Sequence, residues 1–134
     1  MTPNFILAYV ADPPKSAALY GKLLGLAPVE QSPNWAMFVL PNGINLGLWS
    51  KNEVMPKATA PGGVEIGFPV KDDAALRATA KEWAGLGLRI VQEPAQMDFG
   101  LTFTAVDPDG HRLRVFAPSE TATTSRKQVE AEAA

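Results

Sequence analysis

The sequence predicts an α+β protein built from two βαβββ modules. An order of strand, helix and three strands occurs twice, and proline and glycine gather between the two copies at residues 56–63. The 134 residues, 46% of them hydrophobic, suit one ordinary domain or two small half-domains. We therefore expect modules at residues 1–55 and 56–118, followed by a tail or frayed helix at 119–134 that has almost no large apolar residues.

The first module opens with NFILAYV, an apolar run rich in aromatic and β-branched residues that predicts a strand buried on both faces. Asp12 and two prolines end this strand, and residues 15–26 then carry apolar side chains at helical spacing, with Gly25 as the C-cap. Three extended segments separated by turn residues follow, at residues 27–32, 35–41 and 44–50.

The second module repeats this order. Residues 64–70 predict a strand, and residues 72–87 a helix that Asp72 or Asp73 caps at its N-terminus. Three further strands are expected at residues 89–96, 101–106 and 112–118.

Composition narrows the range of partners. A formal net charge of −2 argues against general nucleic-acid binding, and the absence of cysteine excludes disulfides and thiolate metal sites. The sequence shows no secretory signal and no membrane span. We therefore expect a cytoplasmic protein whose partners are small molecules.

The segment DPDGHRLRVF predicts a tight turn at residues 107–110 followed by a strand, and Asp107 and Asp109 are interpreted as turn formers. Alternation along the strand places Leu113 and Val115 on one face and the neighbouring arginines on the other. One face of this strand is thus cationic.

The layout, the V-x-D-x-x-x-S-x-x-L-Y run at residues 10–20 and the turn at 107–110 together resemble the vicinal oxygen chelate superfamily, which includes glyoxalases, extradiol dioxygenases and antibiotic-resistance proteins. The resemblance covers residues 4–118. It implies a glyoxalase-like fold in which each curved mixed sheet encloses a cavity.

In the metal-dependent members of that superfamily, the first and fourth strands of each module supply the ligands. The resemblance places those positions on Phe5, Gly47, Glu65 and Arg114, of which only Glu65 can bind a cation. We therefore expect no metal and no cofactor, although a register slip of one residue would change the position at Gly47. Glu65 and Arg114 are expected to form a charge-assisted pair that leaves N–H groups for a ligand; the alternative is an Arg114 that lies at the surface.

Alternation places apolar and aromatic side chains on the cavity faces, and the glycines at 47 and 67 are expected to leave a flat slot between aromatic walls. The alternative is that these aromatic residues fill a core or a dimer interface. The candidate ligand-binding residues are Phe5, Leu7, Tyr9, Phe38, Gly47, Trp49, Glu65, Gly67, Phe99 and Arg114.

Within the superfamily, TPNFILAYV, INLGLWS, VEIGFPV and FGLTFTAVDPDGHRLRV are most similar to phenazine-binding resistance proteins. This resemblance implies a metal-free homodimer that sequesters a planar aromatic antibiotic by stacking on Trp49, without catalytic residues. A metal-dependent glyoxalase- or dioxygenase-type enzyme is the alternative. A metal-free enzyme with Glu65 as general base is a third hypothesis, which a neighbouring Arg114 weakens because it favours the ionised carboxylate.

Overall fold

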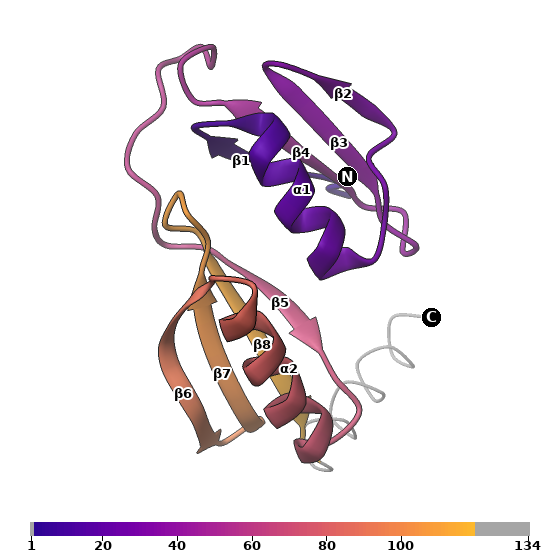
Figure 1. The fold of residues 1–134 in the computed structure, drawn as a ribbon, viewed down its shortest axis with the longest axis vertical. Coiled ribbons are helices and arrows are strands. Elements are labelled where there is room, and N and C mark those ends of the chain that lie inside the picture. Colours follow the sequence, from indigo (N-terminus) through magenta and orange to yellow (C-terminus); the bar gives the residue numbers. More distant parts are fainter. Residues whose placement is uncertain (1, 120–134) are drawn as a thin grey trace. The chain divides into compact units, whose positions relative to one another are not determined.

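The computed structural model describes residues 2–119 and divides the chain into two compact units, with the division between Pro61 and Gly62. Each unit is a βαβββ module with one four-stranded mixed sheet and one helix (Figure 1). The predicted α+β fold class is confirmed. All but the first residue of the expected tail at 119–134 lies outside the described part of the chain.

In unit 1 the sheet has the strand order β1-β4-β3-β2, with β1 parallel to β4 and the other pairs antiparallel. Its elements are β1 (Phe5–Val10), α1 (Pro13–Leu24), β2 (Glu30–Ser32), β3 (Trp35–Val39) and β4 (Asn45–Ser50). Helix α1 begins where the Asp12 carboxylate accepts a hydrogen bond from the Lys15 backbone N–H at 3.2 Å. It ends at Gly25, whose φ of 66° is the left-handed C-cap conformation expected there.

Strand β1 is buried on one face only, so the prediction of burial on both faces was wrong. Ala8 and Val10 are buried beneath α1, whereas Phe5, Leu7 and Tyr9 are 39%, 46% and 38% exposed. The apolar composition of β1 suggested a strand covered on both sides, but the unit has one helix, which lies over one face of the sheet (Figure 1). The other face of sheet 1 is open within this unit.

In unit 2 the sheet has the order β5-β8-β7-β6, again with one parallel pair, β5 and β8. Its elements are β5 (Glu65–Pro69), α2 (Asp73–Gly85), β6 (Arg89–Met97), β7 (Gly100–Val106) and β8 (Arg112–Pro118). Asp72 is the N-cap of α2, and its side chain accepts a hydrogen bond from the Ala75 N–H at 2.8 Å. Trp83 of α2 packs edge-on against Phe68 and Phe103, with ring centroids 5.3 and 5.5 Å away, and so fixes the helix on its sheet.

The turn between β7 and β8 is held by the buried Asp107, as the sequence predicted. Its Oδ1 accepts hydrogen bonds from the backbone N–H groups of Asp109 and His111 at 2.9 and 2.8 Å. The turn directs β8 back along β7 with Leu113 and Val115 buried under α2 and Arg114 on the opposite face. Within residues 2–119, neither helix has the length and apolar character needed to span a membrane.

Candidate ligand-binding faces

The open face of sheet 1 is lined by aromatic and apolar side chains in cross-strand rows. The parallel register of β1 and β4 places Leu7 beside Gly47 and Tyr9 beside Trp49, and β3 adds Trp35 next to Trp49. Directly paired residues point to the same face of a sheet, so these side chains share one surface. We call the set Phe5, Tyr9, Trp35 and Trp49 the aromatic face of unit 1.

The four rings of the aromatic face contact one another in sequence. Trp35 lies tilted against Phe5 at 6.2 Å between ring centroids and edge-on to Trp49 at 6.4 Å. Trp49 in turn lies edge-on to Tyr9 at 6.4 Å. Such pairs add about 0.5–1.5 kcal/mol beyond simple burial, so the rings support one another while their outer surfaces remain partly exposed.

Two sequence expectations for this face need correction. The space beside Gly47 is not an empty slot, because Trp35 lies over it: a Cβ at this position would overlap Trp35 Cη2. Phe38 is fully buried on the helix side of the sheet, one residue out of phase with Trp35 and Met37. The alternation of β3 is the reason, since it directs Ala36 and Phe38 toward α1 and Trp35 toward the open face.

Trp35 is the residue that the candidate set omitted on this face. The sequence did contain the necessary indication, because alternation along residues 35–39 separates Trp35 from Phe38.

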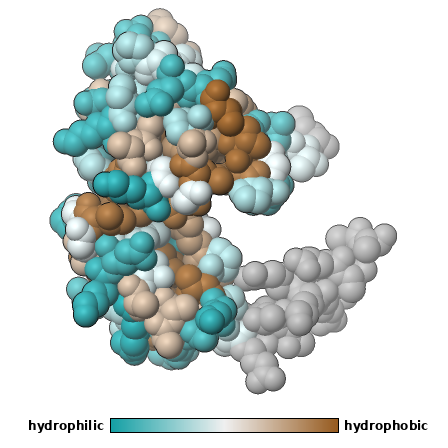
Figure 2. All heavy atoms as spheres, turned by 45° about the vertical axis from the view of Figure 1, so that its right-hand side comes forward, coloured by the Kyte–Doolittle hydropathy of each residue, from teal (hydrophilic) through white to brown (hydrophobic). Residues whose placement is uncertain are grey.

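A space-filling view shows apolar residues gathered in one patch on unit 1 (Figure 2). The large apolar residues of unit 1 that are exposed are Phe5, Leu7, Tyr9, Val29, Val39 and Met55.

The open face of sheet 2 carries the expected ion pair between Arg114 and Glu65. Arg114 Nε donates to Oε1 and Oε2 of Glu65 at 3.1 and 3.2 Å, and Nη2 donates to Oε2 at 3.0 Å. The two side chains are 21% and 35% exposed, so solvent screens the pair and its contribution to stability is about 1 kcal/mol or less. The pair fixes the guanidinium in one orientation above the sheet.

Arg114 is also held from the opposite side. Its Nη1 donates to Gln92 Oε1 at 3.0 Å and to Thr102 Oγ1 at 3.3 Å, and Thr104 Oγ1 donates to the same Gln92 oxygen at 3.0 Å. Thr102 and Thr104 are buried beneath the arginine. The candidate set did not include these three polar residues, although Thr102 and Thr104 alternate on one face of the predicted strand.

Gly67 lies beside Arg114 in the parallel register of β5 and β8, and its surroundings are open. A Cβ there would make only an ordinary contact of 3.4 Å with Phe116 Cε1. Phe99, from the turn before β7, lies edge-on to Phe116 with ring centroids 6.3 Å apart. Glu65, Gly67, Phe99 and Arg114 therefore belong to one face of unit 2.

The residues at the superfamily's ligand positions do not fit a divalent metal. Phe5 and Gly47 have no donor atom, and the Arg114 guanidinium is a permanent cation that already engages the Glu65 carboxylate. In residues 2–119, moreover, no three His, Cys, Asp or Glu side chains are grouped so that they could hold a metal ion.

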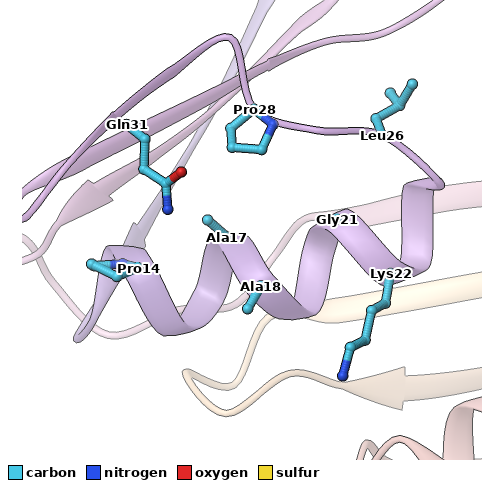
Figure 3. A pocket seen from close by; sticks show the side chains of 8 residues that line it. All are labelled: Pro14, Ala17, Ala18, Gly21, Lys22, Leu26, Pro28 and Gln31. Atoms are coloured by element: carbon cyan, nitrogen blue, oxygen red, sulfur yellow. The ribbon is translucent and has the colours of Figure 1, made fainter.

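A separate shallow hollow of about 340 Å³ lies between α1 and the segment that leads into β2 (Figure 3). Ala17 and Gly21 of the helix face Pro28 and Gln31 across it. None of its lining residues belongs to the candidate set. The hollow has no titratable group other than Lys22, and it is not the predicted site.

Comparison with known proteins agrees with this architecture. Residues 2–115 match the model of the Glyoxalase/Bleomycin resistance protein/Dioxygenase superfamily. The phenazine antibiotic resistance protein EhpR of Enterobacter agglomerans is 30% identical over 118 residues, which cover 86% of this chain and 91% of EhpR.

Solved structures give the same result. The solution structure of protein ATC0852 from Agrobacterium tumefaciens is 49% identical, with a TM-score of 0.83 over 89% of this chain and 98% of that chain. A glyoxalase-related enzyme from Fulvimarina pelagi, 22% identical with a TM-score of 0.78, covers 87% of this chain and 88% of its own and shares the fold. The chain belongs to the Glyoxalase/Bleomycin resistance protein/Dioxygenase superfamily.

Proposed function

We propose that this protein binds a planar aromatic antibiotic of the phenazine type by stacking and lowers its free concentration, thereby contributing to antibiotic resistance. The observation that carries the proposal is the aromatic face of unit 1, in which four contacting rings remain partly exposed. The similarity to EhpR supports the same ligand class.

The chemistry of the two open faces favours binding over turnover. The aromatic face of unit 1 has no acid or base except the Tyr9 hydroxyl. On sheet 2, the Glu65 carboxylate is occupied by two nitrogens of Arg114. A general base needs an unengaged lone pair within reach of the proton that it removes. Sequestration requires neither a base nor a nucleophile.

Isothermal titration calorimetry with phenazine tests the proposal. We expect saturable binding to the wild type and at least a tenfold weaker affinity for Trp49→Ala, because the variant loses both ring area and stacking, together worth about 1.4 kcal/mol or more. Trp49→Phe keeps a smaller ring and should recover part of the affinity. Each variant's unfolding midpoint shows whether the fold is intact.

Met55→Ala is the matched control. Met55 is 82% exposed in the same unit but lies beyond the sheet, so its truncation removes exposed apolar surface without touching the aromatic face. We expect its phenazine affinity to equal that of the wild type. Equal affinities for the wild type and Trp49→Ala, or no phenazine binding at all, would contradict the proposal.

We also propose that the protein acts as a cytoplasmic homodimer. Isologous pairs are the commonest oligomers, and the exposed apolar side chains of unit 1 offer surface that a second copy could cover. Sedimentation equilibrium with and without phenazine tests this: a monomer at micromolar concentration under both conditions contradicts it.

A further inference from the structure

We propose that the open face of unit 2 recognises a carboxylate group, so that the preferred ligands are planar aromatic acids rather than neutral aromatic compounds. The inference rests on the proposed function and goes beyond it, because it names the charged group and the residues that select it. It uses only side chains of unit 2.

The open face of unit 2 has an excess of positive charge. One row of cross-strand partners runs from Glu65 through Arg112 and Val106 to Arg89, and Arg114 lies two residues beyond Arg112 on the same side. Neighbouring strands lie about 4.8 Å apart and successive residues of a strand about 3.3 Å apart, so the Cα atoms of the three arginines fall within roughly 12 Å of one another. The face has three cations against one carboxylate, although the whole chain carries a net charge of −2.

The single carboxylate of this face is already engaged. Glu65 pairs with Arg114, whereas Arg112 and Arg89 are exposed and make no ion pair within the part of the chain described, residues 2–119. An anion that approaches this face therefore meets a net positive charge. Guanidinium groups are also the side chains best suited to planar carboxylates, which they meet through paired N–H donors.

Arg114 is held in one orientation by its hydrogen bonds. Arg114 donates from Nε and one N–H of Nη2 to Glu65, and from the two N–H groups of Nη1 to Gln92 and Thr102. The second N–H of Nη2 has no acceptor among residues 2–119. Because partners on both sides fix the guanidinium, this donor is preorganised. Binding of a ligand that accepts a hydrogen bond from this N–H group therefore costs little side-chain entropy of Arg114.

The open face of unit 2 has space for a flat ring next to these donors. Gly67 is exposed directly beside Arg114, and Phe116 and Phe99 form an aromatic wall along it. A ring laid over the Gly67 backbone would contact Phe116 on one side and place a substituent toward Arg114 on the other. Any larger side chain at position 67 would occupy that space.

Calorimetric titrations with phenazine, phenazine-1-carboxylate and phenazine-1-carboxamide test the inference, since the last two probes differ mainly in charge. The wild type should bind the carboxylate about tenfold more tightly than the carboxamide at low ionic strength, and this preference should shrink as salt is added. Arg112→Gln should lower the carboxylate affinity about fivefold and leave the carboxamide affinity unchanged. Arg112 is exposed, so the fold should tolerate the change.

Arg77→Gln is the matched charge control, because Arg77 is exposed on α2, which covers the other face of the same sheet. It should change the carboxylate affinity less than twofold. Gly67→Val provides an independent variant whose Cβ the structure accommodates; it should weaken both substituted probes by blocking the ring.

The possible outcomes separate the two proposals. If phenazine binds but the carboxylate and the carboxamide bind equally, or if Arg112→Gln and Arg77→Gln behave alike, the charge selection is overturned and stacking stands. If Gly67→Val binds phenazine-1-carboxylate and phenazine-1-carboxamide as tightly as the wild type does, the placement of the ligand ring over Gly67 is overturned. If no probe binds any variant, the proposed function fails and this inference fails with it.

Discussion

A methyl group added at Gly47 should destabilise unit 1, whereas the same change at Gly67 should leave unit 2 at least as stable. At Gly47 the new Cβ would overlap Trp35 Cη2 and lie 2.9 Å from both Trp35 Cζ3 and Leu7 Cδ2. Ordinary carbon contacts begin near 3.4 Å, so the indole must shift. Trp35 can shift only by giving up ring contacts with Phe5 and Trp49.

The size of the effect follows from these contacts. Overpacking a well-filled site costs about 1–3 kcal/mol, and because the Trp35 ring is partly exposed we expect the lower half of that range, about 1–2 kcal/mol. At Gly67 the nearest atom to the new Cβ is Phe116 Cε1 at 3.4 Å. An unstrained replacement of glycine by alanine stabilises by about 0.4–1 kcal/mol through the unfolded chain. The two variants should thus differ by about 2 kcal/mol.

Urea unfolding followed by far-ultraviolet circular dichroism measures this difference, with near-ultraviolet spectra to report whether the indole has moved. Gly47→Ala should lower the midpoint and change the near-ultraviolet signal, and Gly67→Ala should do neither. Equal midpoints for the two variants, or a larger loss for Gly67→Ala, would refute the conclusion that Trp35 fills one site while the other is open.

Two further changes test the hairpins of unit 2. Asp107→Ala removes a buried side chain that accepts from two backbone N–H groups of the turn, and we expect a loss of about 1–3 kcal/mol in urea unfolding, with Asp107→Asn retaining part of the stability. Gly100→Ala should cost about 3 kcal/mol or more, because Gly100 has φ of 131° and a Cβ would overlap the Ala117 carbonyl oxygen; a stable, soluble Gly100→Ala variant with an unchanged midpoint contradicts this.

The order of the elements and the facing of most strands could be predicted from the sequence because they depend on local patterns. Turn residues such as Asp107 act within a few positions, and alternation alone assigns Leu113 to the core and Arg114 to the opposite face. The Glu65–Arg114 pair also follows from alternation once β5 and β8 are neighbours.

Two errors arose where burial depends on neighbours that are distant in sequence, whereas the misplacement of Phe38 went against the local alternation of β3. The apolar residues of β1 cannot reveal that only one helix covers the sheet, so Phe5 and Leu7 were expected to be buried. Nor can a glycine reveal which ring lies over it, and for that reason the Trp35 indole above Gly47 was not anticipated. Residue type predicts what a site can hold, and the tertiary packing decides what fills it.

The two modules use the same positions differently. In each parallel pair the central row joins one glycine to one long side chain, Leu7 with Gly47 in unit 1 and Gly67 with Arg114 in unit 2. Trp35 of β3 is the cross-strand partner of Trp49 in unit 1. The equivalent residue of unit 2 is Thr102 of β7, the cross-strand partner of Phe116.

The strand on which each glycine lies explains why one is covered and the other is open. Gly47 is on β4, beside β3, from which the Trp35 indole reaches over it, whereas Gly67 is on β5 at the edge of its sheet, two strands away from Thr102. Unit 1 therefore presents ring surface and unit 2 presents space beside fixed polar groups. A repeated topology has in this way produced one apolar and one cationic face.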